Sequence, residues 1–164
     1  MSITVRPLTP ADADDCDAIM RTLPDFFGHE GGLAAYREAV RSQAGWVAEE
    51  GGRVVGFATW EERTPATAEV TWMGVERSRR HGGIGTAIVE SLVGELRQKG
   101  YALALALTSA AAKNAGVPDT YVPTRRFWLA RGFLPLIELD IWDTNVALLQ
   151  VRAIAPVEAT EGER

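Results

Sequence analysis

The sequence predicts a single α/β domain, and three observations carry this prediction. Two apolar, strand-like runs, WVAEE and RVVGFATW, are joined by Gly51 and Gly52, which is typical of a hairpin. Further along, the strand-like run AEVTWMGV at 68–75, a glycine-rich turn, a helix-like run and the alternating run YALALALT at 101–108 follow one another, as in a βαβ-type unit. The length of 164 residues fits one hydrophobic core.

The first part of the chain contains a predicted edge strand and two predicted helices. The run ITVRPL at 3–8 alternates in the manner of an edge strand. Thr9 is a good N-cap and Pro10 suits the first helical position, so a helix is expected to run to about Leu23. The apolar spacing of LAAYREAVRSQ predicts a second helix over 33–43.

The strand at 68–75 carries one carboxylate among apolar neighbours. Because side chains alternate along a strand, we expect Glu69 and Met73 to share one face. Val70 and Trp72 are expected to lie together on the other face.

Two further predictions concern the end of the chain. The run NVALLQVRAI at 145–154 alternates well enough to be the last strand. The run APVEATEGER at 155–164 is polar and is expected to fray. Residues 1–154 are therefore expected to form a single domain, followed by a polar C-terminal tail.

Charge and residue usage exclude several classes of function. With 17 Lys and Arg against 22 Asp and Glu, the net charge of -5 argues against a nucleic-acid-binding surface. Cys16 is the only cysteine, and His29 and His81 lack a second ligand at helical spacing, so neither a disulfide framework nor a metal site is expected. No apolar run has the length of a signal peptide or a membrane span, so we expect a soluble, cytoplasmic protein without a membrane partner.

The stretch RSRRHGGIGTAIVESL at 77–92 places glycines in front of an apolar stripe. From Ile84 onward the apolar residues recur at helical spacing, so a helix is expected to run to Lys99 and to end at Gly100. The glycine cluster is then the N-terminus of this helix, where unpaired N–H groups and the helix dipole favour an anion. Glycines also let a bulky anion approach the backbone. The stretch therefore predicts a phosphate cradle with Arg80 beside it, the alternative being a tight turn that binds nothing.

Other phosphate-binding motifs do not fit this stretch. GGIGTA is neither G-x-G-x-x-G nor a loop that ends in Gly-Lys-Ser/Thr. The pattern that remains, R-x-x-G-x-G at Arg80, Gly83 and Gly85, resembles the acyl-CoA-binding motif of the GNAT superfamily of N-acyltransferases. The order of elements matches this family over nearly the whole chain, and TRRFWLARGF at 124–133 resembles its later helix, with an aromatic pair and a closing Gly-Phe.

The resemblance implies a particular fold. The sheet would be mixed and mostly antiparallel, of about six to seven strands, with helices on both faces. The strands at 68–75 and 101–108 would splay apart and form a V-shaped cleft. This cleft is where the substrates of such a transferase are expected to meet.

The resemblance also implies acetyl-CoA as the acyl-donor cosubstrate. The backbone of Met73, Gly74 and Val75 would pair with the pantetheine arm. The pyrophosphate would bind the backbone of the glycine turn and the helix start, which comprises His81, Gly82, Gly83, Ile84, Gly85 and Thr86. The aromatic pair, Phe127 and Trp128, would contact the cofactor.

Transfer to an amine requires that the amine lose its proton before it attacks. The resemblance implies that donor and amine meet in one ternary complex. Glu69 matches the position at which many family members place a glutamate as general base. The alternative for Glu69 is an exposed strand residue or an ion-pair member. Glu61 and Glu62 are nearby alternatives for the base, although their position also suits solvated turn charges.

The aromatic pair departs from the family pattern. In much of the family its second residue is a tyrosine that protonates the departing thiolate, whereas the indole of Trp128 cannot act as a general acid. A thiol of pKa about 8.5 lies closer to neutral pH than a lysine-like amine of pKa about 10.4, so the amine poses the harder proton problem. Tyr121 is the candidate replacement acid, or else a packed or substrate-contacting aromatic.

The acceptor is less well defined. Phe26, Phe27 and His29 lie where the family has its variable acceptor-binding region, which makes them candidate substrate contacts. The sequence thus predicts an N-acetyltransferase that moves an acetyl group from acetyl-CoA to a primary amine of a small molecule or peptide. The expected assembly is a monomer or a homodimer. The alternative is a GNAT-fold module that holds acyl-CoA, or a partner, without turnover.

Overall fold

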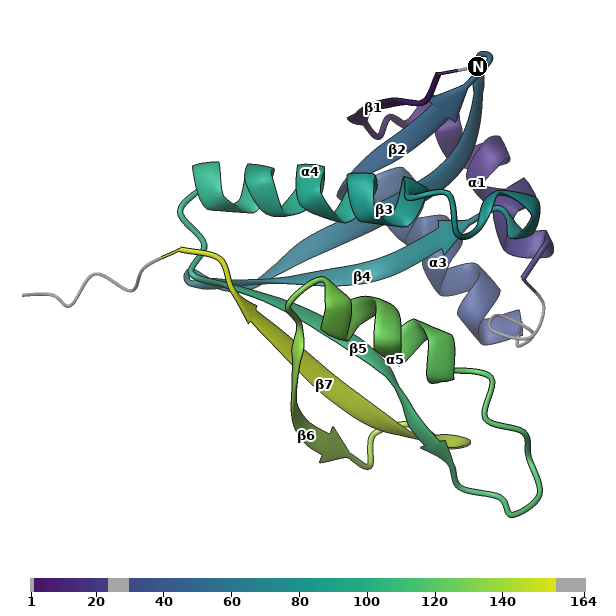
Figure 1. Ribbon diagram of the computed structural model, residues 1–164, viewed down its shortest axis with the longest axis vertical. Helices are drawn as coiled ribbons and strands as arrows, with labels where there is room; N and C mark the ends of the chain where they lie inside the picture. Colours follow the sequence, from purple (N-terminus) through teal and green to yellow (C-terminus); the bar gives the residue numbers. More distant parts are fainter. Residues whose placement is uncertain (1, 24–29, 156–164) are drawn as a thin grey trace, which may run out of the picture.

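A computed structural model describes residues 2–23 and 30–155 as a seven-stranded sheet with helices on both faces (Figure 1). The strands are β1 (Thr4–Pro7), β2 (Ala44–Glu50), β3 (Arg53–Thr64), β4 (Thr67–Val75), β5 (Leu103–Ala112), β6 (Leu134–Leu139) and β7 (Asn145–Ala153). The helices are α1 (Ala13–Arg21), α3 (Glu30–Ser42), α4 (Ile84–Gln98) and α5 (Val122–Ala130), with short 3-10 turns η1 (Pro10–Asp12) and η2 (Arg77–Arg79). The strand order is β1-β2-β3-β4-β5-β7-β6, and of the pairs so described only β4 and β5 run parallel. The predicted mixed, mostly antiparallel sheet is confirmed.

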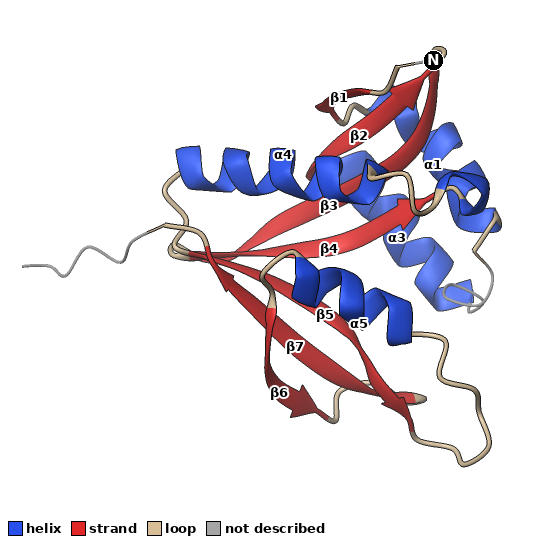
Figure 2. Cartoon of the chain, in the orientation of Figure 1, coloured by secondary structure: helices blue, strands red, loops and turns tan. Residues whose placement is uncertain are grey.

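The helices cover the two faces of the sheet separately (Figure 2). The buried side chains of α1 and α3 form a cluster on one face with Val47 of β2 and Phe57 of β3. On the other face, α4 shares a second cluster with Val70, Ala106 and the α5 residue Trp128. Burial of apolar surface on both faces is what holds these layers together.

The first predicted helix is divided in the structure. Thr9 and Pro10 begin a 3-10 turn, and the α-helix itself runs only from Ala13 to Arg21. The reason is the side chain of Asp12, whose Oδ2 accepts a hydrogen bond of 2.8 Å from the backbone N–H of Thr9 and so tightens the first turn.

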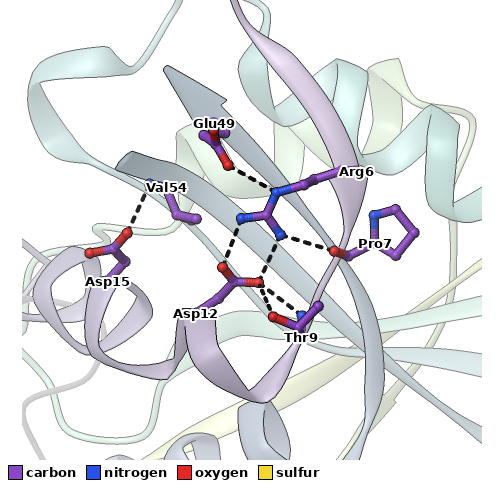
Figure 3. A network of polar contacts seen from close by, with 7 residues as sticks. All are labelled: Arg6, Pro7, Thr9, Asp12, Asp15, Glu49 and Val54. Carbon is purple, nitrogen blue, oxygen red and sulfur yellow. Dashed lines mark hydrogen bonds and ion pairs between the residues drawn. The ribbon is translucent and has the colours of Figure 1, made fainter. Parts of the chain in front are cut away.

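Asp12 also anchors this turn to the edge of the sheet (Figure 3). Its carboxylate, 8% exposed, accepts hydrogen bonds of 3.0 and 2.8 Å from the two terminal nitrogens of Arg6. Arg6 in turn donates from Nε to Glu49 at 2.9 Å. The hydrogen bond from Arg6 is the main reason why the pKa of Asp12 lies below its ordinary value.

Helix α4 confirms the helix predicted from the glycine-rich stretch. Gly83 is its N-cap, with φ of 80°, and Gly100 follows its end with φ of 88°. Positive φ at both ends suits glycine, which has no Cβ to collide with the backbone. Its buried face includes the residues at the predicted spacing, which are Ile84, Ile88, Leu92 and Leu96.

Strand β4 contains a bulge that changes its predicted faces. Two adjacent residues of β3 pair with Val70 and with Trp72, so Thr71 is an additional residue on β4. Val70 and Met73 consequently pack in the same cluster as α4, whereas Trp72 packs against the cluster of α1 and α3. The predictions that Val70 shares a face with Trp72, and Glu69 with Met73, are therefore wrong, because the bulge inverts the alternation.

Strands β4 and β5 pair only near their beginnings, over Thr67–Val70 and Leu103–Ala106. Beyond these pairs β4 continues beside β3 and β5 continues beside β7, so the two strands diverge (Figure 1). The bulge of β4 lies at the point of divergence. The V-shaped splay implied by the sequence resemblance is thus present.

Candidate active site

A cleft of about 980 Å³ opens where β4 and β5 diverge. Its walls come from β3, β4 and β5, from α5 and the loop before it, and from the β6–β7 connection. Ala35 of α3, Gln43 directly after α3 and Arg80 complete the lining. Of the residues predicted for the site, the cleft is lined by Glu69, Met73, Arg80, Tyr121 and Trp128. Glu69 and Met73 belong to β4, Arg80 to the turn before α4, Tyr121 to the loop before α5 and Trp128 to α5, so four separate parts of the fold contribute predicted residues to one space.

Glu69 lies in the wall of this cleft with 13% of its side chain exposed. Its Oε2 accepts a hydrogen bond of 2.5 Å from Nε of Arg63, and this bond raises the pKa of the Arg63 guanidinium. Arg63 also pairs with Glu61 at 3.0 Å. Within the described part of the chain no hydrogen bond reaches Oε1 of Glu69, so this oxygen is available to a ligand.

The two other carboxylates considered as bases differ in position. Glu61 lines the cleft with half of its side chain exposed, and it shares Arg63 with Glu69. Glu62 accepts a hydrogen bond of 2.9 Å from the hydroxyl of Tyr101 and is absent from the described lining of the cleft. Glu61 therefore remains a candidate for ligand contact, and Glu62 does not.

A chain of polar side chains holds the bulged part of β4. The buried hydroxyl of Thr59 bonds to that of Thr71 at 2.8 Å, and Thr71 donates to Oε1 of Gln43 at 2.5 Å. The amide of Gln43 then donates to Glu61 at 3.3 Å. Because Gln43 follows α3, this chain fixes the helix end to the cleft wall.

Trp128 is a core residue and a cleft residue at the same time. Its side chain is 6% exposed, and it packs edge-to-face on Phe127 and Phe133, with ring centroids 5.3 and 4.9 Å apart. The remaining exposed part lines the cleft. The indole therefore shapes the wall of the cleft between the two strands.

Tyr121 lies directly before α5 and lines the same cleft as Glu69. Its backbone N–H donates to Asp119 at 3.1 Å, and Arg125 ties this loop down by pairing with Asp119 and donating to the carbonyl of Ser109 at 2.8 Å. Burial raises the pKa of the Tyr121 phenol, which therefore stays protonated at neutral pH.

The glycine-rich turn leaves the first N–H groups of α4 available. Ala87 is the first residue that donates within the helix, to the carbonyl of Gly83 at 3.0 Å, and no side chain of the described residues caps the helix start. The N–H groups of Ile84, Gly85 and Thr86 precede that first bond. His81 has the unusual φ of 66° for a residue with a side chain, so the turn before the helix is tightly wound.

The glycines at the start of α4 and in β4 serve different structural purposes. A Cβ on Gly83 would meet no heavy atom within 4 Å, whereas a Cβ on Gly85 would lie 3.1 Å from Met73 and 3.2 Å from Phe127. Gly85 therefore permits close packing of α4 on β4 and α5. Gly74 has a similar packing role, because its Cβ would lie 3.2 to 3.3 Å from side chains that include Phe57.

The edge of β4 that faces β5 has no strand partner after Val70 within the described sheet. The backbone of Met73, Gly74 and Val75 belongs to this free part of the strand. A free strand edge offers N–H and C=O groups to an extended ligand.

Some predicted residues fall elsewhere. Phe26, Phe27 and His29 lie outside the described residues. Phe127 is half-buried beside Trp128 and packs against Gly85.

Sequence reasoning missed several residues of the cleft, including Arg63, Thr108, Ser109 and Trp142. A usable signal existed for Thr108, since it places a hydroxyl on the strand face that otherwise carries alanine in YALALALT. Arg63 gave no local signal, because its relation to Glu69 depends on the pairing of two strands.

The described residues contain no cluster of three or more side chains suited to bind a metal ion. None of the helices in the described ranges is long and apolar enough to cross a membrane.

Comparison with known proteins places the chain among acetyltransferases. The profile of the acetyltransferase (GNAT) family matches residues 16–133. No curated protein sequence matches the chain significantly. Among solved structures, the fold is similar to that of a protein from Desulfovibrio desulfuricans assigned to the GNAT family (TM-score 0.81, 22% identity, 94% of this chain and 100% of that chain).

Two further structures have the same fold. Ard1 from Thermoplasma volcanium has a TM-score of 0.76 and 17% identity, covering 95% of this chain and 100% of that chain. A GNAT family acetyltransferase from Elizabethkingia anophelis, solved with acetyl-CoA bound, has a TM-score of 0.67 and 14% identity, covering 92% of this chain and 97% of that chain.

Proposed function

Because the chain belongs to the acetyltransferase (GNAT) family, we propose that it transfers the acetyl group of acetyl-CoA to a primary amine. The observation that carries the proposal is the cleft at the fork of β4 and β5, which has a free strand edge on one side and an uncapped helix start nearby. The acetyl-CoA bound to the Elizabethkingia anophelis protein supports the choice of donor. The acceptor is a small molecule or a peptide, and the protein acts as a monomer or a homodimer.

The donor would lie along the free edge of β4. The backbone of Met73, Gly74 and Val75 would hydrogen-bond its pantetheine amides, which are extended and peptide-like. The N–H groups at the start of α4 would hold the pyrophosphate, together with the guanidinium of Arg80 in the cleft wall. This assignment explains why the helix begins with a glycine N-cap and no capping side chain.

The amine would attack the thioester directly, while both substrates are bound. An aliphatic amine reaches the protein mostly as an ammonium ion, because its pKa is about 10.4. Glu69 would remove the proton, directly or through a water molecule, with Oε1 as the acceptor while Arg63 holds Oε2. The bonds then balance: the deprotonated nitrogen gains the acetyl carbon and releases its second proton to solvent as the amide forms, while the C–S bond breaks and the thiolate leaves.

Tyr121 is the candidate acid for the departing thiolate. Its phenol lines the same cleft as Trp128 and is protonated at neutral pH, since burial raises its pKa. Trp128 would pack beside the pantetheine end and exclude water there.

The competing function is that of a GNAT-fold module that binds acyl-CoA, or a partner, without turnover. Trp128 in place of a tyrosine is the observation that favours this function. Thioester consumption with a panel of primary amines separates the two functions, and mass spectrometry of the products identifies the acceptor. Acetyl-CoA binding without thioester consumption by any amine would support the module. Amine-dependent release of CoA with a matching acetylated product would support the transferase.

A further inference from the structure

Thr108 lines the cleft, and its hydroxyl is buried without a partner among the described residues. Thr108 is 4% exposed and lines the cleft from the β5 side. Its Oγ1 makes no hydrogen bond within the described part of the chain. A buried hydroxyl that leaves water without gaining a partner costs about 1–3 kcal/mol, so such groups are uncommon in native proteins.

Three other buried polar atoms of the described residues lack a partner, but their surroundings differ. Arg79 and Gln150 each bond through another atom of the same side chain, to Glu50 and to the carbonyl of Phe133. The third atom, Nε of Arg131, belongs to a guanidinium with two further nitrogens. The hydroxyl is the only polar group of the Thr108 side chain, and among these four residues only Thr108 lines the cleft.

The strand register places Thr108 opposite the bulge of β4. The last pair between the two strands is Val70 with Ala106, so Thr108 is the second residue of β5 after the strands part. Continuing the parallel register would set it level with Trp72, next to the bulged Thr71. Thr108 therefore faces the narrow end of the fork, at the start of the free edge of β4.

Thr108 shares its strand face with the buried Ala104 and Ala106, which pack in one cluster with Val70 and Trp128. Its hydroxyl thus lies on the side of the sheet that carries α4 and α5. A donor that runs along the free edge of β4, with its pyrophosphate at α4, brings its thioester end to the narrow end of the fork. By the continued register, Thr108 is the β5 residue level with that end.

We infer that the Thr108 hydroxyl binds the acyl-thioester end of the donor, an inference that rests on the proposed function. The hydroxyl would donate a hydrogen bond to the thioester carbonyl or to the pantetheine amide nearest the sulfur. Binding of the donor would then satisfy a group that the fold itself leaves unsatisfied. Thr108 is accordingly a donor-positioning residue and makes no proton transfer.

The test compares Thr108→Val, which removes the hydroxyl and keeps the shape, with Thr108→Ser, which keeps the hydroxyl. Thr108→Val is expected to keep or raise the melting temperature, because it removes an unsatisfied buried group. Calorimetry should show acetyl-CoA binding weakened by about 5–10-fold in Thr108→Val and restored in Thr108→Ser. The same change should appear in the KM for acetyl-CoA, and the KM for the amine should stay constant.

Thr59→Val is the matched control, because Thr59 is fully buried but its hydroxyl is bonded to Thr71. This variant is expected to lower the melting temperature, opposite to Thr108→Val. Wild-type acetyl-CoA affinity in Thr108→Val, or a melting temperature lowered as in the control, would overturn the inference. If the wild type binds acetyl-CoA but acetylates no amine, the transferase proposal fails and the binding comparison still decides the role of Thr108.

Discussion

Glu61 of β3 lies directly opposite Glu69 of β4 in the wall of the cleft. Like charges in such a cross-strand pair repel one another. Arg63 offsets the repulsion by pairing with both carboxylates, at 3.0 and 2.5 Å. One carboxylate charge of this cluster is left uncompensated, which favours the approach of an ammonium group.

The substitution Glu69→Gln tests the base. It should lower kcat by about 10²–10⁴-fold while acetyl-CoA affinity stays nearly constant, because the amide cannot take the proton of the amine. Steady-state kinetics over a pH series and calorimetry measure the two effects. Glu61→Gln is the matched control, with a smaller expected loss of kcat. A wild-type rate and pH profile in Glu69→Gln would show that Glu69 is not the base and serves only in the ion pair with Arg63.

Two substitutions in the glycine-rich turn separate an effect on acetyl-CoA affinity from an effect on the melting temperature. Gly83→Asn should weaken acetyl-CoA binding with little change in melting temperature, since asparagine tolerates positive φ and its side chain would enter open space at the helix start. Gly85→Ala should lower the melting temperature, because its Cβ would press on Met73 and Phe127. Calorimetry and thermal unfolding separate the two outcomes. Equal acetyl-CoA affinity in Gly83→Asn and wild type would argue against a phosphate site at this turn.

Tyr121→Phe tests the candidate acid. If the phenol protonates the thiolate, turnover should slow by at most about 30-fold at pH 7, because a thiol of pKa about 8.5 is only slightly disfavoured as a thiolate there. The slowing should shrink as the pH rises past the thiol pKa. Turnover that stays unchanged across this range would mean that the thiolate leaves unassisted, and a loss of several thousand-fold would mean that Tyr121 also orders a substrate.

Trp128→Phe separates packing from chemistry. Activity should largely remain, since the indole transfers no proton. The free energy of unfolding should fall by about 1–3 kcal/mol, because the smaller ring leaves a void beside Phe127 and Phe133. Urea denaturation and turnover at a temperature below both unfolding transitions measure the two effects independently. A stable variant without activity would instead give the indole a direct role.

The ion pair of Arg6 and Asp12 predicts a pH-dependent stability. The pKa of Asp12 is lower in the folded protein than its unfolded value of about 3.9, so the pair stabilises the fold above that pH and the contribution disappears as the pH falls through the folded pKa. Asp12→Asn should therefore cost about 1–3 kcal/mol at pH 7 and progressively less below about pH 4. Urea denaturation at pH 7 and below about pH 4 measures the loss of stability, and Asp14→Asn at an exposed position is the control. An equal loss at both pH values would exclude the charge as the cause.

Local sequence signals predicted the elements that depend on neighbouring residues. The start of α4 at Gly83 and its end before Gly100 follow from the conformational freedom of glycine and from the apolar spacing between them. The hairpin at Gly51 and Gly52 was predictable for the same reason, and both glycines have positive φ.

Features that depend on distant pairing were not predictable. The bulge at Thr71 arises from the register between β3 and β4. Because of it, Trp72 lies on the opposite face of the sheet from Val70, whereas the sequence alternation predicts the same face. The sequence of β6 shows no clear alternation and contains Pro135, which suits an edge strand, so it does not by itself predict a strand. The bridge of Arg63 between two glutamates likewise requires the folded sheet.

The short parallel contact of β4 with β5 has a consequence for the behaviour of the whole sheet. In the described sheet, those four residue pairs are the sole strand pairing between the plate of β1 to β4 and the plate of β5 to β7. A ligand bound in the fork contacts both plates, so it holds them together for as long as it is bound. At a free ligand concentration of 100 times the dissociation constant, binding raises the free energy of unfolding by about 2.7 kcal/mol. Hydrogen exchange should consequently slow in both plates when acetyl-CoA is added, including strand β7, which does not border the donor's strand.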